Sequence, residues 1–383
     1  MMNVKTASYP KFSDIYVLLF ATLNCKRLFT LGKLIVLSWL LVAHVGSIGA
    51  KEHRQQIIVT DSASLLSAIA KANRHGDTRI ELADGHYSVS HTLIIRADNI
   101  TLVSRSGKAE SVIISGNGMR PSKKVDNLIR VSGKHFTLDG ITLEQAGNHL
   151  VQIAGEEDAD YPTLRNCILR DSYEQLFKVS YNRQTQVASD HGLIENCQFL
   201  YSAGIGPQFY IGGIDVHGGK HWVVQNNVFR DIASPSKHIA EHAIHFWNKT
   251  EFTLIEHNII INCDRGVGFG MEGRPSLGGT ISNNLIYHED NAHPYADAGI
   301  TIEESPNTTV ENNTIVLLHN YPNAIEYRFK STVNVVINNN FLNKAIRQRN
   351  GAQAKLFNNR FSTDPTKLIS TARLVELGLN PKP

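Results

Sequence analysis

The chain of 383 residues contains a short motif that recurs along most of its length. An aliphatic residue, a variable residue and two further residues, most often Asn-Asn, return at intervals of about 20 to 31 residues. The copies begin at Leu164, Ile194, Val224, Ile255, Ile281, Val310, Val336 and Leu356. Periods of this size are typical of solenoids, in which each repeat buries its apolar face against its neighbours. The repeat therefore predicts a stack of similar coils.

Residues 213–232 show what one coil contains. Alternation of apolar and polar residues with period two predicts three short strands, at 213–217, 222–225 and 228–232. The turns between them hold Gly218-Gly219 and Asn226-Asn227. This pattern predicts an all-β fold, a single-stranded right-handed parallel β-helix. An asparagine at a tight corner can adopt the left-handed conformation and bond the asparagines above and below, so we interpret these residues as structural.

Both ends of the solenoid need a cover, because the first and last coils expose their core. Residues 61–73 place apolar side chains at helical spacing, with Asp61 or Ser62 as the N-cap and Gly76 as the end. This predicts an N-terminal capping helix. Residues 368–379 are expected to cap the other end, as a short helix or an irregular tail. No linker divides residues 51–383, which are expected to form one domain.

Residues 1–50 are expected to be a signal peptide or an N-terminal anchor. The apolar run 34–45 follows Lys33 and precedes several small residues, as in a secretory signal. The run is shorter than the roughly 20 residues that a spanning helix needs. Cleavage near Ala50 would leave no membrane span in the mature chain, and an uncleaved anchor is the alternative. Either reading predicts a secreted or periplasmic protein.

Charge and cysteine content exclude several classes of protein. After residue 50 the chain has 33 basic and 34 acidic residues, so its charge does not favour nucleic acid. Cys167 and Cys197 occupy equivalent positions in successive coils, which favours inert packing over a disulfide. No Gly-rich phosphate loop follows a strand into a helix.

One strand of each coil carries the residues that could perform chemistry. Aligned coil by coil, these strands are 128–132, 150–154, 176–180, 213–217, 243–247, 266–270, 299–303, 324–328 and 345–349. Parallel strands lie about 4.8 Å apart, so their outward side chains should form one continuous row. The ionisable and aromatic members of that row are Lys178, Asp215, His217, His245, Trp247, Glu303, Glu326 and Arg328. Gly268 and Gly270 are expected to leave a notch in the row.

The asparagine repeat, the run DGHY at residues 84–87 and the leader resemble the secreted right-handed β-helix proteins of the pectate-lyase superfamily. The N-terminal layout is similar to that of the chondroitinase B and alginate lyase group. The resemblance covers most of residues 51–361 and is architectural. It implies an active centre on the outward strand face and a reaction on an acidic, uronate-containing polysaccharide. The signature motifs of alginate lyases and mannuronan epimerases are absent, so no catalytic residue is transferred by motif.

Cleavage of a uronic polysaccharide by β-elimination needs a base and a cation. The base removes the proton next to the carboxylate, and the cation offsets the developing negative charge. His217, His245 or Lys178 could be the base. Arg328, Arg265 or Lys178 could pair with the carboxylate.

The remaining residues of the row are expected to bind substrate. Trp247 could stack on a sugar ring. Asp215, Glu303 and Glu326 could hold a calcium ion through oxygen ligands, although the sequence establishes no cofactor. His217, His242 and His245 could instead ligate a metal, although no HExxH pair accompanies them.

Three other functions stay open on the sequence. A carboxylate pair formed by Asp215 with Glu303 or Glu326 would suit a glycoside hydrolase. Two histidines on opposite faces of a sugar would suit a C5-epimerase. A non-catalytic solenoid could bind a polysaccharide through the same charged face.

Overall fold

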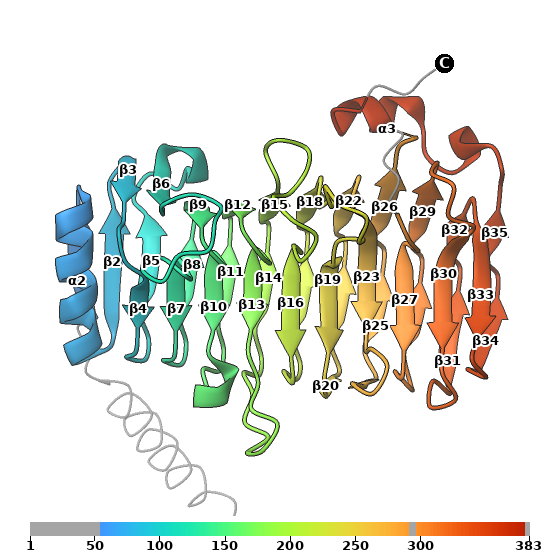
Figure 1. Ribbon diagram of the computed structural model, residues 1–383, viewed down its shortest axis with the longest axis horizontal. Helices are drawn as coiled ribbons and strands as arrows, with labels where there is room; N and C mark the ends of the chain where they lie inside the picture. Colours follow the sequence, from blue (N-terminus) through green and yellow to red (C-terminus); the bar gives the residue numbers. More distant parts are fainter. Residues whose placement is uncertain (1–53, 291–295, 380–383) are drawn as a thin grey trace, which may run out of the picture. The chain divides into compact units, whose positions relative to one another are not determined.

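The computed structural model describes residues 54–290 and 296–379, which form a right-handed parallel β-helix (Figure 1). The predicted fold class is confirmed. The leader and the domain boundary at residues 50/51 lie outside the described residues. Among the residues that are described, no helix is both long and apolar enough to cross a membrane.

Every long strand pairs in parallel with its equivalents in the coils before and after it, so three sheets run along the described part of the chain. The twelve-stranded sheet contains β1 (Gln55–Val59), β2 (Thr78–Leu82), β5 (Thr101–Ser104), β8 (Thr137–Asp139), β11 (Thr163–Arg165), β14 (Leu193–Glu195), β17 (Val223–Gln225), β21 (Leu254–Glu256), β25 (Thr280–Ser282), β28 (Thr309–Glu311), β31 (Val335–Asn338) and β34 (Ala354–Phe357). The ten-stranded sheet contains β4 (Leu93–Ile95), β7 (Ile129–Val131), β10 (Val151–Ile153), β13 (Phe177–Val179), β16 (Ile214–His217), β19 (His242–Trp247), β23 (Arg265–Phe269), β27 (Ile300–Glu303), β30 (Asn323–Arg328) and β33 (Ala345–Arg349). The eleven-stranded sheet contains β3 (Gly85–Ser88), β6 (Val112–Ser115), β9 (Thr142–Ala146), β12 (Ile168–Ser172), β15 (Gln198–Leu200), β18 (Val228–Arg230), β22 (Ile259–Ile261), β26 (Leu285–His288), β29 (Thr314–Leu317), β32 (Phe341–Leu342) and β35 (Arg360–Phe361). A small ladder joins β20 (Thr250–Glu251) to β24 (Ser276–Leu277), and short 3-10 turns lie at Ala109–Ser111, Gly155–Glu157 and Pro365–Lys367.

The predicted coil at 213–232 corresponds to β16, β17 and β18, one strand from each sheet. Its inward residues Ile214, Val216, Val224 and Phe229 are fully buried. Equivalent side chains above and below continue one apolar core through the stack. Because similar coils stack in register, neighbouring strands of a sheet share hydrogen bonds and core contacts.

The corner motif divides its two predicted roles between two adjacent residues. The first, exemplified by Asn226 and Asn312, has φ near +57° and adopts the left-handed conformation. The second is buried, and its side-chain amide donates to the equivalent asparagine of the next coil. This column runs through Asn227, Asn258, Asn284, Asn313, Asn340 and Asn359 with N–O distances of 2.9–3.0 Å.

Two details of the corner differ from the expected positions. In the copy that begins at Val336, the left-handed residue is Asn339 and the buried one is Asn340, one position later than the repeat suggested. At the N-terminal end of the column, Cys167 and Cys197 replace asparagine as buried free thiols.

Helix α2 (Ser62–His75) covers the first coil, as predicted. Asp61 is its N-cap and accepts from the backbone N–H of Ser64, and Gly76 ends it with φ of +67°. Leu65, Ala68, Ile69 and Ala72 are buried. Strand β1, which the sequence pattern did not reveal, precedes the helix and pairs with β2.

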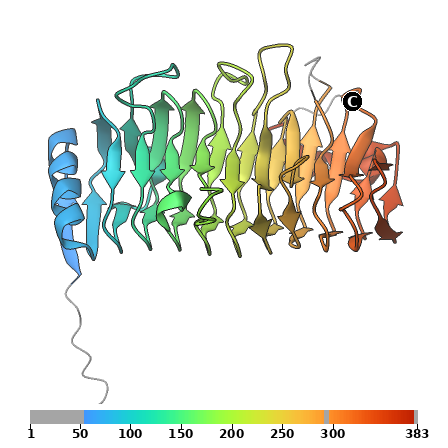
Figure 2. The ribbon, with the colours of Figure 1, turned by 60° about the horizontal axis from the view of Figure 1, so that its bottom comes forward.

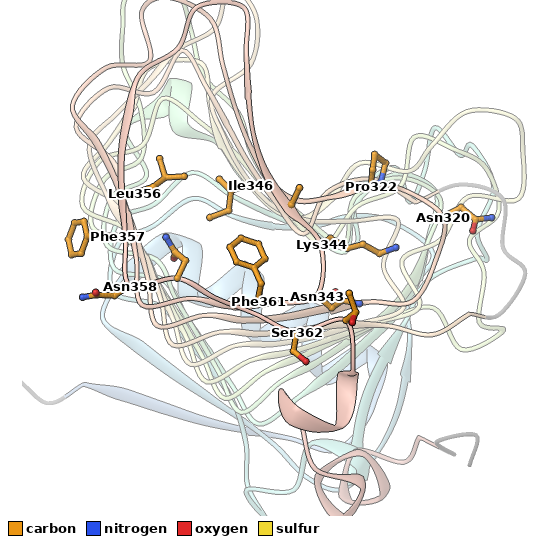
Figure 3. Close-up of a pocket in the computed structure, with 13 residues that line it drawn as sticks. Asn320, Pro322, Asn343, Lys344, Ile346, Leu356, Phe357, Asn358, Phe361 and Ser362 are labelled. Atoms are coloured by element: carbon orange, nitrogen blue, oxygen red, sulfur yellow. The ribbon is translucent and has the colours of Figure 1, made fainter.

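The predicted C-terminal cap is wrong. Residues 371–376 form the short helix α3 (Thr371–Glu376). Its Leu374, with Ile369 and Leu379 on either side of the helix in sequence, packs on the outside of β22, β26 and β29 (Figure 1). Within the described chain the last coil stays open. A hollow of about 890 Å³ lies at this end, with the half-exposed Phe357 and Phe361 on its wall (Figure 3). The tail instead buries its apolar side chains against Ile261, Tyr287 and Val316 on the side of the solenoid.

Candidate functional site

The outward residues of the ten-stranded sheet stand in the predicted order. Lys178 pairs in register with Asp215, Asp215 with His245, His245 with Gly268, Gly268 with Thr301 and Thr301 with Glu326. In the parallel row, His217 pairs with Trp247 and Glu303 with Arg328. The predicted juxtaposition on one sheet face is therefore present. Figure 2 shows that loops entering this sheet, including those before β16 and β19, rise from the same side of the solenoid.

Lys178, Asp215 and His217 form a central cluster on β13 and β16. The ammonium of Lys178 donates to Asp215 Oδ2 and lies 2.9 Å from His217 Nε2. The indole N–H of Trp247 donates to Asp215 Oδ1 at 2.5 Å, and His217 Nε2 lies 3.6 Å from the same oxygen. The side chains of Lys178 and His217 keep 13% and 17% of their surface exposed, so a ligand can reach them.

The electrostatics of this cluster set opposite pKa shifts on its two titratable partners. Burial alone would raise the pKa of Asp215, but the positive charge of Lys178 outweighs burial and holds that pKa well below its usual range. Burial lowers the pKa of His217 more than Asp215 raises it. Near neutral pH, Asp215 is therefore a carboxylate and His217 a neutral imidazole.

The hydrogen bonds of His217 define its tautomer. Lys178 has only donors, so Nε2 of the neutral ring accepts and Nδ1 carries the proton. The amide nitrogen of Asn248 lies 3.1 Å from Nδ1, so a proton on Nδ1 requires this amide to turn and accept through its oxygen. His217 therefore presents a basic nitrogen beside an ammonium group.

His245 lies next to this cluster but is not accessible to a substrate. It is 4% exposed, Nε2 lies 3.0 Å from the carbonyl of Gly270, and burial lowers its pKa to about 4. The ring stacks on Trp247 at 5.1 Å. This burial contradicts a role of His245 as the base that touches the sugar.

Trp247 cannot stack on a sugar ring as predicted. It is 7% exposed, because His245 lies parallel to its indole and the guanidinium of Arg274 sits 4.8 Å from its ring centroid. Its function in this geometry is to hold Asp215. The expected notch is also filled, because the His242 ring lies over Gly268, where a Cβ atom would be 2.7 Å from Nε2.

Glu303, Glu326 and Arg328 form a second group, well separated from the central cluster. Arg328 pairs with Glu303 at 2.7 Å, and Glu326 accepts from Tyr321, Asn323 and Arg349. Five strand steps separate β13 from β30, so Lys178 and Arg328 are about 24 Å apart along the stack. Arg328 and Lys178 therefore cannot act on the same sugar.

The same spacing contradicts two predictions that bring Asp215 together with Glu303 or Glu326, the calcium site and the glycoside hydrolase pair. Three strand steps separate Asp215 from Glu303, about 14 Å, and Glu326 lies one step further. One calcium ion has oxygen ligands at 2.3–2.6 Å, so these three acids cannot share it. A glycoside hydrolase pair needs carboxyl groups within roughly 9.5 Å, which neither Glu303 nor Glu326 offers to Asp215.

Arg265 lies at the edge of the central cluster. Its guanidinium is 3.8 Å from Glu241 and 3.4 Å from Asp297, so both neighbours are acidic. This arrangement leaves Arg265 as a cation that a polysaccharide carboxylate could approach only in competition with Glu241 and Asp297.

Two further residues belong to this region and were not predicted. Tyr210, on the loop before β16, is 37% exposed, and its pKa is raised by burial, with Lys178 and Asp215 acting on its hydroxyl. Glu241 immediately precedes β19, and burial raises its pKa against the influence of Arg265. Both lie in loops that precede β16 and β19, outside the alternating strand pattern from which the other candidates were predicted.

Comparisons with known proteins agree with this architecture. The family described as right handed beta helix region matches residues 186–363. An alginate lyase from Paenibacillus sp. str. FPU-7 superposes with a TM-score of 0.55 at 14% identity, over 80% of this chain and 99% of that one. A mannuronic acid specific polysaccharide family 6 lyase from human gut microbiota gives a TM-score of 0.48 at 14% identity, over 80% of each chain.

No curated protein matches the chain in sequence. At 14% identity the structural likeness concerns the fold and transfers no residue role. The matched segment 186–363 covers the C-terminal coils of the stack, and the three sheets continue from it toward the N-terminus. The chain is accordingly a right-handed parallel β-helix protein, with a cluster of lysine, aspartate and histidine on the outside of one sheet.

Proposed function

We propose that this protein is an enzyme that cleaves an acidic, uronate-containing polysaccharide by β-elimination, and that it works outside the cytoplasm, secreted or in the periplasm. The observation that carries the proposal is the 2.9 Å contact between Lys178 Nζ and His217 Nε2, on an exposed solenoid face. An ammonium and a neutral imidazole side by side are the cation and the base that this reaction requires. The likeness in fold to an alginate lyase supports the substrate class.

In the proposed reaction, the uronate carboxylate draws the ammonium of Lys178 away from His217 Nε2. The freed nitrogen takes the proton from the carbon next to the carboxylate. The C–H electrons form a double bond to the neighbouring carbon, whose bond to the glycosidic oxygen breaks. Tyr210, kept protonated by its raised pKa, donates a proton to the leaving oxygen. Lys178 balances the negative charge that develops on the carboxylate.

Asp215 and Trp247 position this pair and do not touch the sugar. Asp215 is 4% exposed and receives bonds from both Lys178 and the Trp247 indole. A fixed carboxylate that accepts from both the Lys178 ammonium and the Trp247 indole holds Lys178 next to His217 before substrate arrives. Such preorganisation avoids reorientation during the reaction.

The test is incubation of the purified protein with alginate, pectin and chondroitin while ultraviolet absorbance is recorded. A lyase leaves a carbon–carbon double bond conjugated to the carboxylate, so absorbance should rise together with new reducing ends. Reducing ends without absorbance would show a hydrolase. Altered uronate stereochemistry without cleavage would show an epimerase, and binding without product would show a carbohydrate-binding module. Each of these three results would reject the lyase proposal.

A further inference from the structure

Glu241, His242 and His245 form a compact group at the start of β19 that the proposed reaction does not use. Each residue offers one ligand atom, and these atoms lie within 4.8 Å of one another. We infer that this triad is a site for a divalent transition ion of the zinc type. The inference does not depend on the proposed lyase reaction.

The hydrogen bonds of the two histidines leave one nitrogen of each ring for a metal. His245 Nε2 lies 3.0 Å from the carbonyl of Gly270, which can only accept, so Nε2 carries the proton and Nδ1 keeps its lone pair. His242 Nε2 lies 3.0 Å from the hydroxyl of Thr301. Metal-binding histidines usually hold their second ring nitrogen in this way, against a carbonyl or another polar group.

A second, independent observation at His242 also points to a ligand. Nδ1 of this histidine is buried and has no hydrogen-bond partner within the described residues. Buried polar atoms are nearly always paired, because an unpaired one loses its hydrogen bonds to water without replacement. A metal ion beside His245 and Glu241 would complete this nitrogen's coordination.

The charge state of the group also suits a metal. Glu241 adds a carboxyl oxygen on a side chain that is 31% exposed. Arg265 is the cation nearest to Glu241, at 3.8 Å, and Asp297 on its other side offsets it.

The donor set indicates which kind of ion fits. Two imidazole nitrogens and one carboxylate oxygen are ligands of zinc, cobalt or nickel, whereas calcium and magnesium prefer oxygens throughout. Zinc binds such ligands at about 2.0–2.2 Å. Three protein ligands leave a fourth position open for water or a solute.

The fold explains why the triad can form. The His242 ring occupies the space over Gly268 in the next coil, where an added Cβ would lie 2.7 Å from Nε2. Only glycine at this position lets the imidazole lie flat against the sheet. Gly268→Ala should therefore displace the ring without removing a ligand.

The experiment measures binding of zinc chloride and cobalt chloride to the full chain after treatment with a chelator. Equilibrium dialysis gives stoichiometry, the visible spectrum of bound cobalt reports nitrogen and oxygen coordination, and the melting temperature shows whether metal stabilises the fold. The variants are Glu241→Gln, His242→Gln, Gly268→Ala and Thr301→Val. His257→Gln, on an exposed corner of another sheet, is the matched control.

We expect one equivalent of metal in the wild type and in His257→Gln. Thr301→Val should weaken binding roughly tenfold to a hundredfold, as loss of an outer hydrogen-bond partner does, and Glu241→Gln should weaken it more. Absence of stoichiometric binding by the wild type would overturn the inference. Unchanged metal affinity in a folded Glu241→Gln protein would also overturn it. This measurement decides the question even if His242→Gln fails to fold.

Discussion

Two groups of ionisable side chains lie on the outside of the ten-stranded sheet, and they differ in how their charges are paired. In the group on β27, β30 and β33, each acid has its own arginine, Glu303 with Arg328 and Glu326 with Arg349. In the group on β13 and β16, Lys178 is shared between Asp215 and His217. In the group on β27, β30 and β33 both acids are paired. In the group on β13 and β16, a substrate carboxylate that attracts Lys178 would free the basic nitrogen of His217.

The comparison shows that a row of charged residues does not by itself define an active site. Both groups continue the same register and present similar residue types. In an acid–arginine pair the two charges neutralise each other and stabilise the fold. A neutral imidazole held beside an ammonium can instead accept a proton from a substrate. We therefore propose that the group on β13 and β16 performs the chemistry and that the group on β27, β30 and β33 stabilises the fold.

The largest expected effect is that of His217→Gln on turnover. Loss of a general base should lower kcat/KM by about 10²–10⁴-fold, because Gln cannot accept the proton. Steady-state rates on the polysaccharide identified in the absorbance assay, with the melting temperature of each variant, check this. Full activity in the folded variant would remove His217 from the mechanism.

Glu326→Gln should act on stability instead. Its side chain is 2% exposed and accepts three hydrogen bonds, so replacement should cost about 1–3 kcal/mol. The measurement is urea unfolding, with kcat/KM as the control. A loss of activity with unchanged stability would reverse the division between the two groups.

The pH dependence of unfolding sharpens this result. Burial would raise the pKa of Glu326, but hydrogen bonds from Tyr321, Arg349 and Asn323 outweigh it and leave the pKa lowered. A lowered carboxyl pKa contributes stability above the unfolded value of about 4.3 and loses it as pH falls through the folded value. Wild-type protein should therefore lose unfolding free energy as the pH falls, and Glu326→Gln should lose less. Urea unfolding at a series of acidic pH values measures this acidic limb. An unchanged limb would show that other carboxylates cause it.

The pH profile of activity tests the other group. Burial lowers the pKa of His217, so its neutral form persists below the ordinary histidine value of about 6.5. The acidic limb of kcat/KM should therefore lie below pH 6.5 rather than at it. An acidic limb above that value would contradict His217 as the base of the free enzyme.

The smallest effect is expected for Glu303→Gln. Arg328 and Glu303 keep 27% and 15% of their side-chain surface exposed, and partly exposed pairs contribute about 1 kcal/mol or less. Activity should stay within about twofold of the wild type, because Glu303 lies about 14 Å from Asp215. A large loss of kcat/KM would show that the substrate spans both groups.

The architecture of this protein could be predicted from its sequence because the signals are local and repeated. Period-two alternation in 213–232 and the recurring corner motif need no knowledge of distant contacts, and β16 to β18 follow them closely. The register of Lys178 with Asp215 and His245 also follows, since equivalent strands of identical coils must stack. The sequence therefore determined which residues share a face.

Only the tertiary structure decided which of those residues are accessible, paired or close enough to act together. His245 and Trp247 have the alternation of exposed residues, yet the two rings stack on each other, and His242 and Arg274 cover them. Strand spacing places Asp215 and Glu303 on one face but about 14 Å apart. Tyr210 and Glu241 reach the cluster through loops, whose path depends on packing rather than on any periodic signal. Burial, pairing and distance arise from contacts between segments remote in sequence, so a linear pattern cannot contain them.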